Sequence, residues 1–398
     1  MRIRVGVKKG DVVGRTNREL QMAADLLAAK GGGTLEIGPG VYTMEDALHL
    51  RSGVHVTGAG AKTVLKRAGG VSALAVDDPD LGQQKVKVKS TRGFKVGMGV
   101  TILDDKAGGY MTSVSRITKI DARKKVIYVA DHHVFNYHLE HRARITNAAS
   151  VISAKDVEDV VVENLTVDGN RRRNRETING CVGGGIYLFK AKRCRIAGCK
   201  VKDFSGDGIS FQITQDIVVE DCVVDGVSVL GIHPGTGSAR PVVRRCKMMD
   251  CGADGLFLCW RVQEGLFEKC EVTGSGRWGI SIGHKDSRNL FRGNTVRKSA
   301  LSGIIFRNDP KRNTGNYNRF EKNLIEANGQ KTASCAVEIR GETTGLEFTG
   351  NTIRPGRAAK KGAGQRLAFG VGPVADMPKT RRNKVARHRD GVTARITY

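Results

Sequence analysis

A period of 23 or 24 residues runs through the middle of the chain and constrains its fold more than any other feature. One column consists of an aliphatic residue that directly follows a glycine: Ile186, Ile209, Ile232, Leu256, Ile280 and Ile304. A second column pairs a cysteine or asparagine with an aliphatic residue two positions later: Cys199/Val201, Cys222/Val224, Cys246/Met248, Cys270/Val272 and Asn294/Val296. Two independent columns with the same period indicate a repeated structural unit.

The repeated apolar segments are short, rich in Val and Ile, and bounded by Gly, Asp or Asn, which is typical of strands. Counterparts in successive repeats would pair as parallel strands, and their inward residues would stack into one continuous core. We therefore predict an all-β chain, a right-handed parallel β-helix (a solenoid) of about ten to twelve coils. Asn amides can hydrogen-bond along such a stack, and the four Cys of the second column are interpreted as buried structural thiols in the same position.

Segments outside the repeat complete the predicted organisation. A capping box, Thr16 to Glu19, opens a helix over 17–29 that would cap one end of the coils. Strands are expected around 34–37, 54–57 and 63–65. The predicted parts are 1–81, with the N-terminal cap helix and first coils; 82–147, an inserted small β subdomain; 148–354, the regular coils; and 355–398, a basic C-terminal segment.

The net charge of +26 should attract a polyanion at long range. Part of the excess, eleven Lys and Arg against two Asp, falls in residues 355–398, which we interpret in part as a solvated tail. We expect an anionic polysaccharide as partner rather than nucleic acid, because no aromatic platform interleaves with the basic residues. No apolar run is long enough for a membrane helix. The N-terminus has no apolar export signal, so export would require that a leader had been removed; the oligomeric state is left open.

Two stretches resemble known β-helix proteins. Gly10-Asp, Thr16-Asn and the run from Gly32 to Tyr42 are similar to the opening of pectate-lyase-like proteins. The run Val167-Asp-Gly-Asn-Arg171 is similar to the first coil of mannuronan C5-epimerases. Gly231-Ile-His-Pro234 stands where that family has Gly-Phe-Asp-Pro-His, and Asp254 stands where its next coil carries a catalytic Asp.

The sequence departs from the epimerase pattern at three positions. His233 replaces the family's Asp, Gly235 its His and Leu230 its Tyr, so Pro234 and Asp254 are the residues that carry over. The resemblance implies a β-helix fold and a role in polysaccharide processing. It leaves the reaction open, because members of the superfamily include lyases, hydrolases, epimerases and phage tailspikes.

Stacking of the coils would place several polar residues on one face. We predict Asp207, His233 and Asp254 as catalytic residues: His233 would serve as base or acid, and the carboxylates would orient it or complete the proton transfer. The predicted substrate-binding residues, which would hold the carboxylates of an acidic glycan, are Gln212, Arg261, His284, Lys285 and Arg307. The structural alternative is that an Asp before a Gly simply forms a turn.

These residues favour a polysaccharide lyase that acts by β-elimination on a glycan containing uronic acid. A C5-epimerase and an inverting hydrolase are alternatives. Asp207 and Asp254, two coils apart, would lie about 9.6 Å from each other, near the upper end of the range for inverting enzymes. Binding of a polyanion without catalysis is a further alternative. We expect no cofactor; calcium has little support, because acidic pairs such as Asp77-Asp78 and Asp104-Asp105 do not fall on this face.

Overall fold

The computed structural model describes residues 1–357 and 362–397. Contacts divide the chain into two compact units. The N-terminal unit contains Met1–Val160, Asn164–Phe189 and Val201–Ser210. The C-terminal unit contains Val161–Glu163, Lys190–Lys200 and Phe211 onward. Two strands, β19 (Lys200–Lys202) and β20 (Ile209–Gln212), contain residues of both units.

The N-terminal unit begins with the predicted helix. Helix α1 (Asn17–Ala29) starts at Thr16, whose hydroxyl accepts a hydrogen bond from the Arg18 amide and whose own amide donates to Glu19 at 2.9 Å. The capping box and the helix bounds are therefore confirmed. The apolar face of α1, which includes Leu20 and Leu27, is buried against neighbouring strands, so the helix covers strands that would otherwise face solvent. No helix among the described residues has the length and apolar character needed to cross a membrane.

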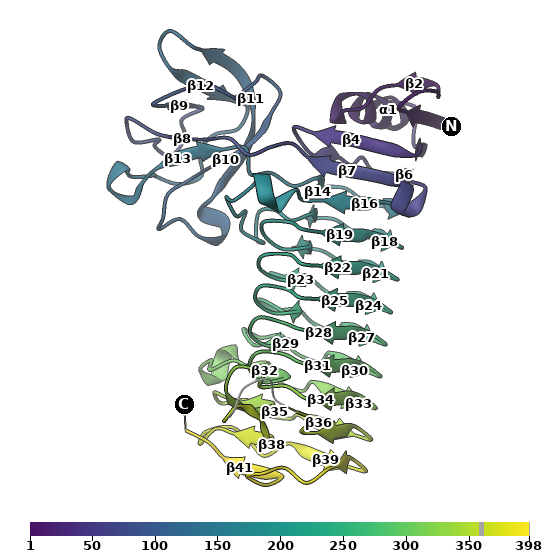
Figure 1. Ribbon diagram of the computed structural model, residues 1–398, viewed down its shortest axis with the longest axis vertical. Coiled ribbons are helices and arrows are strands. Elements are labelled where there is room, and N and C mark those ends of the chain that lie inside the picture. Colours follow the sequence, from purple (N-terminus) through teal and green to yellow (C-terminus); the bar gives the residue numbers. More distant parts are fainter. Residues whose placement is uncertain (358–361, 398) are drawn as a thin grey trace. The chain divides into compact units, whose positions relative to one another are not determined.

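The coils of the N-terminal unit consist of three groups of parallel strands (Figure 1). The strand orders are β2-β1-β3-β6, β4-β7-β16 and β5-β14-β17. The predicted strands around 34–37, 54–57 and 63–65 are confirmed as β3, β6 and β7. The bounds are β1 (Arg2–Gly6), β2 (Val12–Val13), β3 (Gly33–Ile37), β4 (Gly40–Met44), β5 (Leu48–His49), β6 (Val54–Thr57), β7 (Thr63–Arg67), β14 (Ile152–Lys155), β16 (Thr166–Asp168) and β17 (Ile186–Phe189).

A six-stranded antiparallel sheet interrupts the coils of this unit, in the order β8-β13-β10-β11-β12-β9. It has its own apolar core, which includes Val100, Ile102, Ile117 and Ile127. Its first strand, β8, lies before residue 82, so the insertion begins earlier than the sequence predicted. The bounds are β8 (Ser72–Leu74), β9 (Lys85–Lys87), β10 (Gly99–Leu103), β11 (Ser113–Asp121), β12 (Val126–Val129) and β13 (Arg144–Thr146).

The C-terminal unit is a regular stack in which each coil contributes a strand to three parallel sheets, called A, B and C (Figure 1). Sheet A contains β15 (Val161–Glu163), β18 (Arg195–Ala197), β21 (Val218–Glu220), β24 (Val242–Arg244), β27 (Leu266–Glu268), β30 (Leu290–Arg292), β33 (Arg319–Glu321), β36 (Glu347–Thr349) and β39 (Lys379–Arg381). Sheet B contains β22 (Val223–Asp225), β25 (Lys247–Met249), β28 (Glu271–Thr273), β31 (Thr295–Arg297), β34 (Leu324–Glu326), β37 (Thr352–Arg354) and β40 (Lys384–Val385). Sheet C contains β23 (Ile232–Gly235), β26 (Leu256–Phe257), β29 (Ile280–Ile282), β32 (Ile304–Phe306), β35 (Ala333–Ile339), β38 (Gly364–Val371) and β41 (Thr393–Arg395).

The predicted register is confirmed in this unit. In sheet C, Ile232 pairs with Leu256, Leu256 with Ile280 and Ile280 with Ile304. Inside sheet A, Phe267, Phe291, Phe320 and Phe348 form a continuous stack with ring centroids 4.6–4.8 Å apart. Identical residues of successive coils therefore fill the core directly above one another.

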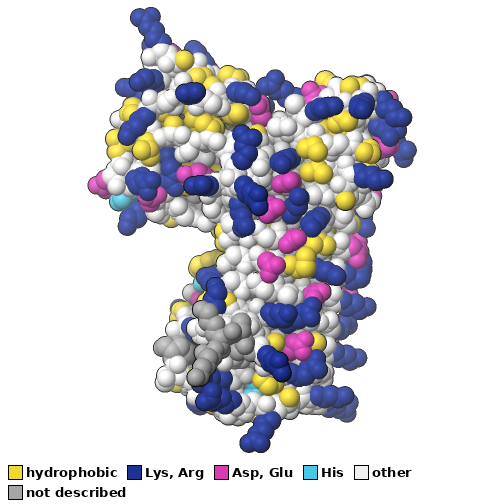
Figure 2. Space-filling view, in the orientation of Figure 1, with side chains coloured by type: hydrophobic (Ala, Val, Ile, Leu, Met, Phe, Trp, Pro, Cys, Tyr) yellow, Lys and Arg dark blue, Asp and Glu magenta, His cyan; other side chains and the backbone are white. Residues whose placement is uncertain are grey.

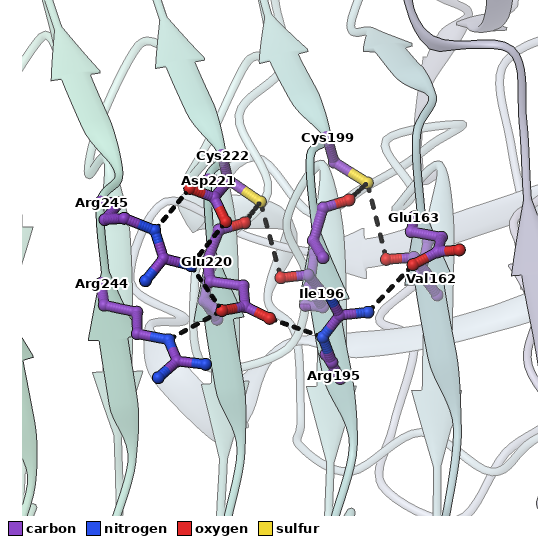
Figure 3. Close-up of polar contacts among 12 residues, drawn as sticks. Val162, Glu163, Arg195, Ile196, Cys199, Glu220, Asp221, Cys222, Arg244 and Arg245 are labelled. Atoms are coloured by element: carbon purple, nitrogen blue, oxygen red, sulfur yellow. Dashed lines mark hydrogen bonds and ion pairs between the residues drawn. The ribbon is translucent and has the colours of Figure 1, made fainter.

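The Cys and Asn column is structural, as predicted. All nine cysteines are free thiols. Those of the column donate to backbone carbonyls of their own and the preceding coil, as Cys222 does to Glu220 at 3.2 Å and to Ile196 at 3.6 Å (Figure 3). Further along, Asn323 donates to the side chain of Asn351 at 2.9 Å and accepts from the Asn294 side chain at 3.0 Å. A buried polar column is thus hydrogen-bonded from coil to coil.

The outer side of sheet A carries charges of alternating sign. Arg195 bonds Glu163 at 2.9 Å and Glu220 at 2.6 Å, and Arg244 bonds Glu220 at 2.7 Å from the other side (Figure 3). Burial alone would raise the pKa of Glu220, but the hydrogen bonds from the two arginines lower it. Figure 2 shows further Lys and Arg side chains projecting along one edge of these coils.

The C-terminal segment corrects one expectation. Residues 355–398 were interpreted in part as a solvated tail, but β38, β39, β40 and β41 extend all three sheets. Its apolar residues, such as Phe369 and Val371, are buried in the core. Residues 358–361, which include two of the lysines, lie outside the described residues. The positive charge of this segment is therefore carried largely on ordered coils.

Candidate functional site

His233 lies on the outer face of sheet C, at the start of a row formed by equivalent residues of successive coils. The register places His233 beside Phe257, and Phe257 beside Ser281. The His233 ring meets the Phe257 ring edge to face, with centroids 5.2 Å apart, and its Nε2 lies 3.5 Å from Gln212 Nε2. His233 is only 3% exposed and Gln212 is fully buried. These two predicted site residues are therefore shielded from solvent.

Arg307 reaches across this row and joins three coils of the C-terminal unit. Its guanidinium donates to Ser281 at 2.9 Å and to the Leu258 carbonyl at 2.8 Å, and it lies 4.6 Å from the centroid of the Phe257 ring. It also approaches Asp286 at 3.3 Å. Arg307 was predicted as a cation for substrate carboxylates, but its charge is largely satisfied within the protein. These contacts hold the outer face together, and a role of Arg307 in substrate binding stays a prediction.

Asp286 is a fully buried carboxyl group beneath this face. It accepts hydrogen bonds from the amides of Val262 at 2.9 Å and Gly283 at 3.1 Å, and it pairs with Arg307. Burial raises its pKa to about 6, despite the nearby guanidinium. Asp286 therefore changes its protonation state in a range where most aspartates are fully ionised.

The most exposed part of the site is a group of residues called the exit-turn cluster: Trp260, Arg261, His284, Lys285 and Asp309. The rings of Trp260 and His284 stack with centroids 4.8 Å apart, and Trp260 is 41% exposed. Arg261 and Lys285 are exposed beside them. The cluster therefore presents an aromatic surface together with two cations to solvent.

His284 is oriented by contacts on both ring nitrogens. Its Nε2 lies 3.1 Å from Asp309, and its Nδ1 lies 3.3 Å from Arg307. The guanidinium group can only donate hydrogen bonds, so Nδ1 must be the acceptor. These contacts assign the proton of a neutral ring to Nε2 and leave the lone pair on Nδ1. Burial would raise the pKa of Asp309, but its hydrogen bonds with the side chain and amide of His284 lower it. A neutral His held by an ionised Asp is an arrangement suited to proton transfer.

The backbone of the exit-turn cluster is unusual. Trp260 and Arg261 have φ of 62° and 67°, and His284 and Lys285 have φ of 46° and 67°. Within the described ranges, no other two consecutive non-glycine residues both have positive φ. This conformation costs free energy for residues with a Cβ, and such strain concentrates at functional sites. The same pair of left-handed residues is repeated at the same turn of two successive coils.

Asp254 occupies a different environment from the one expected. It is fully buried, and Arg277 binds both of its oxygens, at 3.0 and 3.2 Å. Burial raises its pKa, while the charges of Arg277 and Arg307 act in the opposite direction. Asp254 therefore links its own coil to Arg277 and Trp278 of the next one, and its catalytic role stays a prediction.

Asp207 belongs to the N-terminal unit, whereas His233 and Asp254 belong to the C-terminal unit. Asp207 is 1% exposed, and its carbonyl accepts the Gly185 amide at 2.9 Å. The grouping of all three as a catalytic set remains a prediction. Within the C-terminal unit, the structure brings together Gln212 with His233, and Arg307 with His284.

Sequence reasoning assigned no role to three members of the site. Trp260, Asp286 and Asp309 each stand at the end of a sheet C strand, and no column of the repeat distinguishes them. The signal that could have identified them is the pair of bulky non-glycine residues at a turn where Gly237 stands in the preceding coil. No group of three or more His, Cys, Asp or Glu in the described parts of the chain is placed to hold a metal ion.

Comparisons with known proteins agree with the fold. The search of curated proteins gave no match. The A-module of the mannuronan C-5 epimerase AlgE4 from Azotobacter vinelandii superposes with a TM-score of 0.57 at 15% identity, over 98% of this chain and 97% of that one. A glycoside hydrolase superposes with a TM-score of 0.55 at 11% identity, over 98% and 96% of the two chains. The enzymatically active domain of tailspike protein 2 from bacteriophage CBA120 has a TM-score of 0.52 at 11% identity, over 88% of this chain and 43% of that one.

At these identities the superpositions show a common fold. The family model described as a right-handed β-helix region matches residues 99–261 and 236–363, which together make up more than half of the chain. The strands and registers of both units have the parallel stacking that this description requires. The chain therefore belongs to the family of proteins with a right-handed β-helix region.

Proposed function

We propose that this protein is an enzyme that acts on an acidic polysaccharide containing uronic acid, and that it cleaves the polysaccharide as a lyase by β-elimination. The observation that carries the proposal is the exit-turn cluster, where an exposed Trp, two exposed cations and a His–Asp pair occupy strained turns of two successive coils. A sugar ring offers C–H groups to an aromatic face, and its carboxylate requires a cation. Both requirements are met within one cluster.

The chemistry of β-elimination assigns roles to these residues. A base removes the proton at C5, next to the carboxylate; the electron pair forms the C4–C5 double bond, and the glycosidic oxygen leaves C4 and takes up a proton. Arg261 and Lys285 would bind the carboxylate and so stabilise the negative charge that develops when C5 is deprotonated. His284 is the better placed base: its Nδ1 would accept the C5 proton once the substrate displaces the contact with Arg307, and Asp309 lies behind its Nε2. His233 is retained as the second proton-transfer group.

The relatives with the same fold support a role in carbohydrate processing. Two of the superposed proteins are named as a mannuronan epimerase and a glycoside hydrolase. Mannuronan is a polyuronate, and its epimerisation begins with the same removal of the C5 proton. An epimerase is therefore the second candidate for this chain. The observation that favours it is the buried Asp254 carboxyl group, whose raised pKa suits a proton donor.

One set of incubations separates the candidates. Purified protein is mixed with alginate, pectate and glycosaminoglycans, and the absorbance of unsaturated uronide, the reducing ends and the C5 configuration are followed. Rising absorbance is the expected result. Reducing ends without absorbance would indicate a hydrolase. Inverted C5 without cleavage would indicate an epimerase, and binding with none of these changes a non-catalytic polyanion-binding protein.

A matched pair of variants tests the cluster. Lys285 and Lys269 are both exposed, both have positive φ, and both stand at turns of the C-terminal unit, but Lys269 lies between sheets A and B. We expect Lys285→Ala to raise KM by about tenfold, the value of one charge-assisted hydrogen bond. Lys269→Ala should leave KM unchanged. Equal effects of the two substitutions would remove the exit-turn cluster from the substrate site.

The two histidines are distinguished in the same assay. His284→Ala should lower kcat by about 10²–10⁴. His233→Ala should lower kcat to a comparable extent only if it takes part in proton transfer; unchanged turnover would restrict His233 to packing against Phe257. Full activity of His284→Ala would overturn its assignment as base.

A further inference from the structure

A buried arginine in the N-terminal unit lacks a partner for its charge. Arg67, the last residue of β7, is 4% exposed. Its Nη2 donates to the Asn147 carbonyl at 3.1 Å, but its Nε and Nη1 are buried without a hydrogen bond. Its one aromatic contact is with Phe204, at 5.8 Å from the ring centroid. A buried charge is costly unless it is paired, and no carboxylate within the described residues forms an ion pair with Arg67.

Arg67 lines a cavity of about 280 Å³ that is also lined by a basic loop. The loop contributes Arg172, Arg173 and Arg175, and none of these has an ion pair with another described residue. Glu176 also lines the cavity, but it is engaged by Arg144 at 3.4 Å. Four guanidinium groups therefore surround a space that holds no free carboxylate of the described chain.

Two glycines beside Arg67 leave room for the basic loop. A Cβ on Gly69 would lie 3.0 Å from Arg173 Nη2, and a Cβ on Gly70 would lie 2.6 Å from the Arg173 carbonyl. Two successive glycines thus allow the loop to approach closely. Asn174 fixes the loop by donating to the Ala68 carbonyl at 2.9 Å. Its own Oδ1 is buried and accepts no hydrogen bond.

We propose that this cavity, the Arg67 pocket, binds a phosphate group. The Arg67 guanidinium, which has donors without partners at Nε and Nη1, would bind the anion, and the arginines of the loop would complete the neutralisation of its charge. Asn174 Oδ1 requires a hydrogen-bond donor, which monoprotonated phosphate supplies and sulfate does not. The site takes either free phosphate or the phosphate of a sugar ester. It is independent of the proposed polysaccharide chemistry, because it shares no residue with the exit-turn cluster.

Calorimetry on the full chain tests the proposal, with sodium phosphate, glucose 6-phosphate and sodium sulfate as probes at constant ionic strength. Phosphate or the sugar phosphate should bind at one site and raise Tm, and the tighter of the two identifies the source. Sulfate should bind at least about tenfold more weakly, the value of one lost hydrogen bond to a buried group. Binding of neither phosphate probe would overturn the proposal, and equal binding of sulfate would overturn the assignment to phosphate.

Three variants locate the site. Arg67→Met removes the unpaired charge and should abolish the rise in Tm with phosphate, without lowering Tm in its absence. Arg173→Ala should weaken phosphate binding by about tenfold, and it keeps the test valid if Arg67→Met does not fold. Arg171→Ala is the matched control, because Arg171 is exposed in the same loop but does not line the cavity. Two results would contradict the site. One is phosphate binding that is unchanged in both Arg67→Met and Arg173→Ala. The other is phosphate binding that is weakened in Arg171→Ala as much as in Arg173→Ala.

Discussion

Two aspartates close to Arg307 show how local surroundings decide the behaviour of a side chain. Burial raises the pKa of Asp286 to about 6, whereas hydrogen bonds from His284 outweigh burial at Asp309 and lower its pKa. The sequence analysis assigned no role to either aspartate, because both pKa shifts depend on neighbours from other coils. It did place His284 and Arg307 near each other, since stacking alone brings them to adjacent turns.

The raised pKa of Asp286 predicts a pH dependence of stability. In the folded protein Asp286 binds a proton up to about pH 6, whereas the unfolded chain releases it near the ordinary value of 3.8. Its contribution is therefore fully present below pH 3.8 and is lost as pH rises through 6. Denaturant unfolding of wild type and Asp286→Asn between pH 4 and 7 should show the wild type losing about 2 kcal/mol relative to the variant. Parallel pH profiles for the two proteins would contradict this.

Asp309 should act on catalysis through His284. Asp309→Asn keeps the shape of the side chain but removes the charge that stabilises a protonated His284. We expect kcat to fall by about 10²-fold or more with a small change in KM, and the pH–rate profile to move, which a purely structural role would not produce. Steady-state kinetics across pH on the substrate identified above provide the measurement. An unchanged profile with a lower Tm would assign Asp309 to stability alone.

The columns of residues that define the coils were the most predictable elements. Spacing of 23 or 24 residues was sufficient for the sheet C register and for the buried Cys and Asn positions. The Phe stack was not predicted, because longer turns before Phe320 and Phe348 disturb the period. Strand β8 was missed because Ser72–Leu74 is too short to show alternation and pairs with residues far along the chain, Arg144–Thr146.

The hydrogen-bonded Asn column should contribute strongly to stability. Asn323→Ala would leave the Phe291 carbonyl, the Asn294 amide and the Asn351 side chain with lost partners in a buried position. We expect a loss of about 2–4 kcal/mol in the free energy of unfolding. Cys246→Ala, in the same column, loses only weak sulfur contacts and should cost about 1 kcal/mol. Denaturant titrations compare the two, and similar losses would contradict the role assigned to the amides.

At the scale of the whole molecule, the net charge of +26 was the main guide to the partner. The structure refines it: alternating Glu and Arg on sheet A pair with each other, so these side chains contribute little to the excess. The exit-turn cluster was predicted only in part: Arg261, His284 and Lys285 were grouped from the sequence, whereas the contacts of Trp260 and Asp309 with His284 depend on side-chain geometry.

Binding of a polyuronate should therefore depend on salt. Affinity measured between 50 and 500 mM salt should fall steadily, since screening weakens exposed charge pairs. Replacing Lys285 by Ala should reduce this salt dependence more than replacing Lys269, because only Lys285 is expected to contact the glycan. Binding that is insensitive to salt would indicate that the positive charge serves no role in recognition.

The central claim is that this protein removes the C5 proton of a uronic acid residue at the exit-turn cluster. The most direct measurement is an NMR time course of polyuronate incubated with the protein in D₂O. The account predicts loss of the C5 proton signal, with unsaturated chain ends for a lyase or deuterium at C5 for an epimerase, and neither change with His284→Ala. Retention of every C5 proton while the chains shorten or bind would contradict it.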